Sequence, residues 1–176
     1  MNLQEQINRI NEMMGILTED RRAHAFFKFL DKKLNEKWYS ASLGVKPVDD
    51  AVKMAINDGY IHHILRLMVV GNFMNLVGIH PDDVYKWFME FSLDSYDWVM
   101  VGNVYSMAMW SDGGLTMRKP YISGSGYIMK MSNYPRDKTT NNTNTNTWQQ
   151  QWDDIFHDFI NSSMKPAALF FVYDLI

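Results

Sequence analysis

Apolar residues recur at helical spacing near the start of the chain. Leu3, Ile7, Ile10 and Met14 are separated by four, three and four positions, which is the spacing of one face of an α-helix. A second helix is expected after Thr18, because threonine is a common N-cap. Its buried face would consist of Phe26, Phe27, Leu30 and Leu34. Residues 38–44 are expected to form a connector.

The most apolar part of the chain follows that connector. Pro47, with Asp49 and Asp50 behind it, has the composition of a helix N-terminus, because proline fits the first turn and carboxylates favour the positive end of the helix dipole. Apolar content rises through residues 61–70 until the segment is hydrophobic on nearly all sides, which is typical of a buried helix. We expect this long helix to end at Gly78.

The pattern changes after the next helix, which is predicted to begin at Pro81 and to extend towards Trp98. Turn signals then occur at short intervals: Gly102-Asn103, Asp112-Gly113-Gly114 and Lys119-Pro120. Because aromatic residues interleave these signals, we predict a long ordered loop rather than disorder.

A low-complexity linker and a last helix complete the pattern. Residues 139–147 are only Thr and Asn, a composition that cannot pack into a core. A helical apolar face then returns with Trp148, Trp152, Ile155, Phe156 and Phe159. The sequence predicts an all-α fold in four parts: N-terminal helices over 1–37, a core over 38–134, a linker over 135–147, and a helix with a tail over 148–176.

Composition narrows the function classes. The 176 residues are 47% hydrophobic and carry a formal net charge of −3, which excludes a disordered chain and a protein that coats nucleic acid by charge alone. Cysteine is absent, so this chain cannot form disulfides or hold an Fe–S cluster. No signal peptide or membrane span is recognisable, and a soluble intracellular protein without a membrane partner is expected.

Two adjacent histidines, His62 and His63, occur in the most apolar segment. Neighbouring side chains on a helix point about 100° apart, so the pair cannot chelate one metal ion well, and no metal site is expected. Two interpretations stay open. The histidines are satisfied residues at the edge of the core, or they perform acid–base chemistry in an aromatic pocket.

Arg66 lies in the same apolar segment and has no acidic neighbour in sequence. A buried arginine requires a carboxylate or an anionic ligand, and Asp94 and Asp97 are the candidates. A purely structural ion pair and a pair that also contacts a ligand are both compatible with this pattern. Two interpretations of the aromatic residues also stay open: they pack in the core, or they form a pocket for a flat ring system. These residues are Trp38, Trp87, Trp98, Trp110, Tyr121 and Tyr127.

Three blocks of sequence together resemble a known family. They are YIHHILRLMVVGNF over 60–73, YDWVMVGNVY over 96–105, and the region 112–134 with DGG, KPYISGS and MSNY. In this order and spacing they resemble the photolyase-related flavoproteins of the cryptochrome/photolyase superfamily, a group that includes the prokaryotic (6-4) photolyases. The resemblance extends over about residues 38–159.

The resemblance implies the C-terminal part of an all-α FAD-binding domain that drives light-dependent DNA repair by electron transfer to UV photoproducts such as (6-4) lesions. His62 and His63 match a pair that faces the lesion, one being the proposed proton donor. Arg66 and Asp97 match an ion pair near the flavin ring, and Asn103 matches the residue opposite flavin N5. The other matches are Tyr121 and Tyr127 on the substrate side, and Trp87 and Trp38 in the electron-carrying ring chain.

Two departures qualify the resemblance. Many relatives hold a 4Fe–4S cluster on four cysteines, and the matching region over 131–138 has none. Members of the family are also several hundred residues long. The expected partners are therefore UV-damaged DNA and a complementary chain carrying the missing half. The alternatives are a non-enzymatic remnant of a split or truncated gene and a cryptochrome-like photoreceptor, so whether the chain is an active DNA photolyase, a lyase, stays open.

Overall fold

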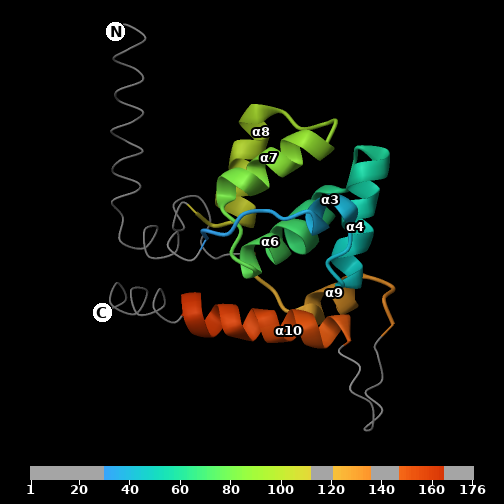
Figure 1. The fold of residues 1–176 in the computed structure, drawn as a ribbon, viewed down its shortest axis with the longest axis vertical. Coiled ribbons are helices and arrows are strands. Elements are labelled where there is room, and N and C mark those ends of the chain that lie inside the picture. The colour runs from blue at the N-terminus through green and yellow to red at the C-terminus, as the bar shows by residue number, and fades with distance from the viewer. Residues whose placement is uncertain (1–29, 112–120, 136–146, 165–176) are drawn as a thin grey trace, which may run out of the picture.

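A computed structural model describes residues 30–111, 121–135 and 147–164 of the chain (Figure 1). These residues fold into helices. The β-type pairing among the described residues is limited to one isolated parallel bridge between Lys32 and Ile79. The predicted all-α fold is confirmed. None of the described helices is both long and apolar enough to cross a lipid bilayer.

A nearly continuous helical run forms the centre of the fold. It comprises α5 (His63–Leu65), the π-helix η1 (Arg66–Gly71) and α6 (Asn72–Leu76). Every residue of η1 and α6 is buried, as expected from a segment that is apolar on all sides. Figure 1 shows α7 (Pro81–Phe91) and α8 (Asp97–Val101) on one side of this run and α10 (Trp148–Phe159) on the other.

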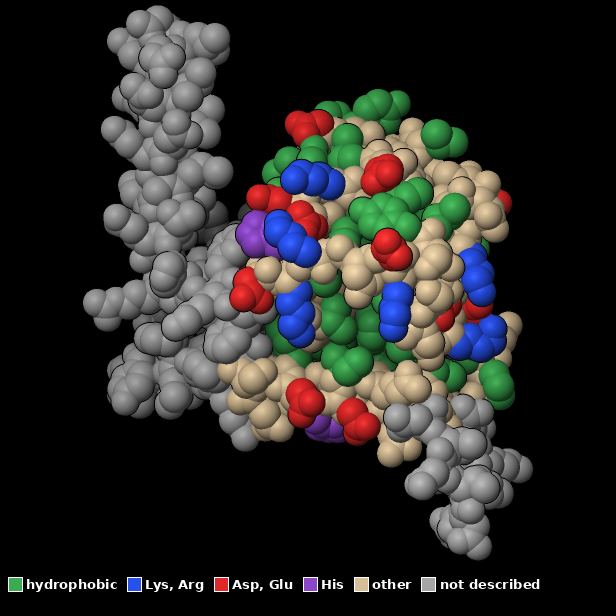
Figure 2. Space-filling model, in the orientation of Figure 1, with side chains coloured by type: hydrophobic (Ala, Val, Ile, Leu, Met, Phe, Trp, Pro, Cys, Tyr) green, Lys and Arg blue, Asp and Glu red, His purple; other side chains and the backbone are tan. Residues whose placement is uncertain are grey.

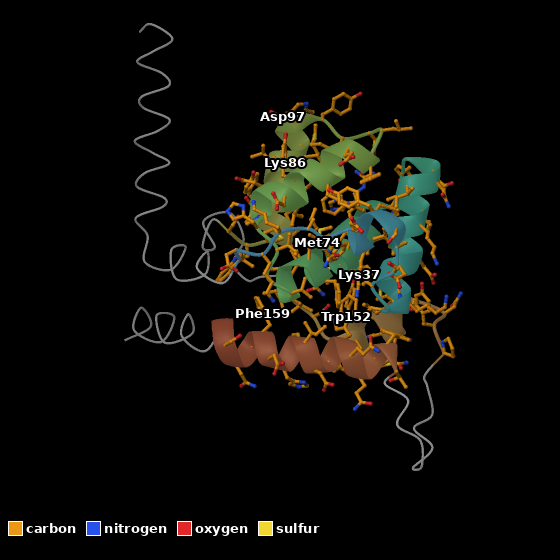
Figure 3. The ribbon with its side chains drawn as sticks, viewed as in Figure 1. Lys37, Met74, Lys86, Asp97, Trp152 and Phe159 are labelled. Carbon is orange, nitrogen blue, oxygen red and sulfur yellow. The ribbon has the colours of Figure 1, made fainter. Side chains whose placement is uncertain are left out.

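The remaining elements enclose that centre. They are α3 (Lys37–Ser40), α4 (Lys46–Asp58), the π-helix η2 (Gly102–Ala108), α9 (Ser125–Met131) and the π-helix η3 (Ile160–Met164), which continues α10. The core is rich in fully buried large side chains, among them Trp38, Trp87, Trp152, Phe88 and Met74. In Figure 3, Met74 lies in the middle of the molecule. Trp152 and Phe159 of α10 are on one side of it, and Lys86 and Asp97 are on the other.

The predicted long helix from Pro47 to Gly78 is wrong, because the chain breaks it near its middle. Gly59 adopts a left-handed conformation with φ 62° and ends α4, and its N–H donates to the Ala55 carbonyl. Helix resumes only at His63. The break matters for function because it places the histidine pair at the start of a helix rather than inside one.

The predicted loop after Trp98 is also wrong over its first part. Residues 97–108 form α8 and η2, although Gly102 and Asn103 are turn-forming types. Tertiary packing overrides their local preference, because Met100, Val104 and Ala108 on this helix are buried in the core. The rest of the predicted loop over 112–120 lies outside the described residues, as do 136–146 of the predicted linker.

The helix predicted to follow Thr18 and to include Leu30 and Leu34 is wrong for the residues that the structure describes. Residues 30–35 are not helical, because the Lys32 N–H donates to the Gly78 carbonyl and its own carbonyl accepts from His80. The expected connector over 38–44 instead begins within α3, which buries Trp38. The helix predicted over Leu3–Met14 lies outside the described residues, whereas the one starting at Trp148 is confirmed.

Candidate functional site

A shallow hollow of about 10 Å³ lies where α5 and η1 meet α7, α8 and η2. The structure brings three predicted site residues together there: His63, Arg66 and Asn103. Its other lining residues are Leu67, Phe88, Met100, Val104 and Ala108. The hollow therefore has an apolar base and a rim with an imidazole, a guanidinium and an amide.

Two walls of the hollow are π-helices, η1 and η2, whose wider turns are frequent at functional sites. They pack closely at Gly71. A Cβ atom added there would lie 2.8 Å from the Arg66 carbonyl oxygen and 2.9 Å from the Ala108 Cβ. Sequence reasoning missed this feature, because π-helices have no distinct hydrophobic period.

Gly71→Ala is expected to destabilise the protein by about 1–3 kcal/mol, because the added methyl group must push η1 and η2 apart. The matched control is Gly102→Ala. Gly102 is helical with φ −64°, and a Cβ atom there meets nothing within 4 Å, so about 0.5–1 kcal/mol of stabilisation is expected. Urea denaturation of both variants measures the difference. Equal effects would contradict the close packing of the two walls.

Arg66 is buried, with 8% of its surface exposed. Its Nε donates to the Ile61 carbonyl at 2.8 Å, and its Nη2 pairs with the Asp94 carboxylate at 2.5 Å. The guanidinium carbon lies 5.4 Å from the centre of the Tyr60 ring. Of the two carboxylates that the sequence left open, the structure therefore selects Asp94.

Asp97 does not join this pair. It accepts a hydrogen bond from the Tyr85 hydroxyl, across from α8 to α7. The Tyr105 ring centre lies 5.8 Å from that of Tyr85, and the Tyr105 hydroxyl donates to the Asp82 carboxylate at 2.6 Å. Burial and the Asp82 carboxylate raise the pKa of Tyr105 far above its usual range, so this phenol stays neutral and keeps its hydrogen bond. Asp97 is thus placed outside the hollow.

The two histidines have different positions. The Nδ1 atom of His62 accepts from the Ile64 N–H at 3.2 Å, so this side chain caps α5. His63 has an exposed position at the edge of the hollow. The geometry leaves His63 as the one that can face a ligand bound in the hollow.

Asn103 lies half-buried in the wall formed by η2. Its side-chain Nδ2 donates a long hydrogen bond, of 4.0 Å, to the Met100 sulfur. Sulfur is a weak acceptor, so this contact satisfies the amide poorly. The amide can therefore donate to, or accept from, a polar atom of a ligand.

Trp87 and Trp38 are buried in the core behind the hollow. The Trp87 ring centre lies 5.2 Å from that of Phe88, a lining residue, and its Nε1 donates to the Trp38 carbonyl at 3.4 Å. Rings continue from Trp38 to Phe73 at 6.2 Å and from Phe73 to Trp152 at 4.9 Å. Trp87 thus packs against a lining residue of the hollow, whereas Trp38 belongs to a series of rings with Phe73 and Trp152 and is joined to Trp87 by the hydrogen bond of its backbone carbonyl.

Tyr127 lies elsewhere, in an apolar groove of about 100 Å³ between α4, the α5–η1 run and α9. Ile64, Leu65 and Met68 line this groove, so it uses a different face of the central helix from His63. Tyr121 is half-buried and does not line this groove. The structure does not bring the two tyrosines together with the histidine.

Comparisons with known proteins give two relatives, and no protein-family model matches the sequence. The chain is 55% identical to the uncharacterized protein R855 of Acanthamoeba polyphaga mimivirus over 93 residues, which cover 53% of this chain and 69% of the viral protein. It is 36% identical to a (6-4) photolyase of Agrobacterium fabrum over 104 residues. That match covers 59% of this chain but 20% of the photolyase.

The match that covers 69% of the viral protein assigns the family, whereas the match to the photolyase covers 20% of that protein and relates part of this chain to it. The all-α fold agrees with the helical domain that the photolyase resemblance implies. The chain belongs to the same protein family as the uncharacterized protein R855 of Acanthamoeba polyphaga mimivirus.

Proposed function

We propose that this chain supplies the flavin-contacting part of a photolyase-like protein that repairs UV-damaged DNA with light. The observation that carries the proposal is the convergence of His63, Arg66 and Asn103 on one hollow. All three belong to sequence blocks that resemble photolyases, and the relative with 36% identity is a (6-4) photolyase.

The residues of the hollow fit the edge of a flavin ring. Such an edge presents carbonyl oxygens and ring nitrogens, which suit the weakly satisfied amide of Asn103 and the guanidinium of Arg66. The volume of the hollow is about 10 Å³, room for roughly one water molecule, whereas small-molecule sites are typically roughly 300–1,000 Å³. The proposal therefore assigns this chain only one side of the flavin, with a complementary chain supplying the other.

In this role the side chains of the hollow would hold the flavin and orient it. When bound, FAD supplies light absorption and one-electron transfer. Arg66 is fixed by Ile61 and Asp94, so its remaining N–H groups have a defined direction. His63, at the open edge, is the group placed to give a proton to a bound lesion. The buried tryptophans Trp87 and Trp38 are the proposed oxidisable residues that pass an electron through the core, and Phe88 packs between Trp87 and the hollow without being oxidised itself.

Flavin titration of the full chain tests the proposal. Because this chain supplies only one side of the site, we expect weak but saturable binding of FAD and riboflavin, measured by loss of flavin fluorescence. Asn103→Leu should weaken binding about tenfold, because a lost hydrogen bond to a ligand is worth roughly 1.4 kcal/mol. Tyr134→Phe, which removes a hydrogen bond to Asp50 on the apolar groove, is the matched control and should bind flavin normally. Absence of saturable binding, or equal loss in both variants, would contradict a flavin site in the hollow.

A further inference from the structure

The apolar groove between α4, the α5–η1 run and α9 has the size of a site for a very small molecule. Its volume is about 100 Å³, against about 10 Å³ for the hollow at His63. An enclosed apolar cavity of about 150 Å³ holds one benzene molecule, so this groove accommodates most of a single aromatic ring. Ile64 and Met131 at its edge are 42% and 64% exposed, so the rest of a ligand can extend through the open side.

Three methionines among the lining residues favour an aromatic ring over an aliphatic chain. Met54, Met68 and Met131 come from α4, η1 and α9, so each wall of the groove contributes one of them. Thioether sulfur makes favourable contacts with aromatic rings, and the unbranched methionine side chain adapts to irregular space. Met68 is buried, whereas Met54 and Met131 are exposed, so these two can move to cover a ring.

The polar end of the groove is a carboxylate that can accept a further hydrogen bond. Lys46 Nζ and the Tyr134 hydroxyl both donate to Asp50 Oδ2, each at 2.8 Å. Burial acts to raise the pKa of Asp50, but these hydrogen bonds and the nearby lysine charges outweigh it and hold the pKa below its ordinary value. Asp50 is therefore charged at neutral pH. None of the described residues donates to its Oδ1 atom, and a carboxylate accepts up to about four hydrogen bonds.

The charges beside Asp50 disfavour a cationic ligand group. The Lys46 ammonium already pairs with the carboxylate, and the charge of Lys53 on the same helix also acts on it. A second ammonium group at Asp50 would therefore be repelled by two lysines. Figure 2 shows lysine and acidic side chains next to hydrophobic ones along the α4 side of the molecule, at the right. This end of the groove thus selects a neutral O–H or N–H donor.

We propose that the apolar groove binds a small neutral aromatic molecule with one hydroxyl or N–H donor, its ring among the methionines and its donor on Asp50. An apolar pocket with a few convergent polar groups is the usual form of a small-molecule site. This inference goes beyond the proposed function. The groove uses a different face of the central helix from His63, so the inference holds whether or not the hollow takes a flavin.

Phenol is the first probe, and NMR of the full chain with isotope-labelled methionine methyl groups is the measurement. We expect saturable ring-current shifts at Met54, Met68 and Met131, with a dissociation constant in the millimolar range because so small a ligand makes few contacts. Single substitutions to leucine assign the signals. Met100, which lines the hollow at His63, is the internal control and should not shift.

Asp50→Leu tests the polar end, because leucine has nearly the same shape as aspartate and accepts no hydrogen bond. It should weaken phenol binding about tenfold and leave benzene binding unchanged, since benzene has no donor. Asp58→Leu is the matched control. Asp58 is an exposed acid on the same helix that does not line the groove, so its loss should affect neither ligand.

A second variant keeps the test decisive if Asp50→Leu disturbs the groove and loses benzene as well. Asp50→Asn preserves the shape of the side chain, and its neutral oxygen is a weaker acceptor than a carboxylate. It should weaken phenol binding about threefold and leave benzene binding unchanged. Equal weakening of both ligands in Asp50→Asn would overturn the role of Asp50.

Benzylamine tests the preference for a neutral donor, and it should bind more weakly than phenol because of Lys46 and Lys53. Tighter binding of benzylamine than of phenol would overturn that preference. Absence of saturable shifts with phenol would overturn the proposal in favour of a groove filled by one of the chain's own segments or by a second copy. Shifts at Met100 as large as those in the groove would overturn it in favour of non-specific binding.

Discussion

His63→Ala is expected to lower the rate of light-driven lesion repair by about 10²–10⁴-fold, the usual contribution of a positioned general acid or base. His63 lines the edge of the hollow and is not among the buried residues of the core, so its loss should leave the fold and flavin binding unchanged. The measurement is the recovery of intact bases from an oligonucleotide carrying a (6-4) lesion, under blue light and in the dark, with flavin-loaded protein.

His62→Ala is the matched control for that prediction. His62 is adjacent in sequence, but its Nδ1 atom is engaged with the Ile64 N–H. Its removal should cost about 0.5–1.5 kcal/mol of stability for the lost hydrogen bond and leave repair close to normal. A flavin-loaded complex of the wild-type chain with its complementary chain that shows no light-dependent repair would contradict the proposed function, and an equal loss in both variants would contradict the separate roles of the two histidines.

Trp152→Ala is expected to destabilise the protein by about 3–5 kcal/mol, a large part of the roughly 5–15 kcal/mol that holds a domain together. Trp152 is fully buried, and its ring centre lies 4.9 Å from that of Phe73 in α6. Its Nε1 donates to the Ser123 carbonyl at 3.0 Å. The substitution leaves a cavity between α10 and the central helical run.

Denaturant unfolding followed by circular dichroism measures this effect. Asp154→Ala is the control, because Asp154 lies on the same helix with an exposed side chain and should change stability by no more than about 0.5 kcal/mol. A Trp152→Ala variant as stable as this control would show that α10 does not depend on its packing against α6.

Some properties of this protein follow from its sequence alone. Hydrophobic periodicity predicted an all-α fold, because burying an apolar stripe is the main reason that amphipathic segments become helices. The same reasoning located α10 and the N-terminus of α7, where Pro81 precedes two acidic residues. The sequence blocks with His63, Arg66 and Asn103 also indicated the residues that meet in the hollow.

Other properties were decided only by tertiary structure. Gly102, a turn-forming residue type, continues a helix because its neighbours Met100 and Val104 are buried. The partner of Arg66 could not be chosen from sequence, since Asp94 and Asp97 are three positions apart and only the turn between α7 and α8 determines which one reaches it. Local preferences are worth about 1 kcal/mol or less per residue, and the packing of a buried side chain outweighs them.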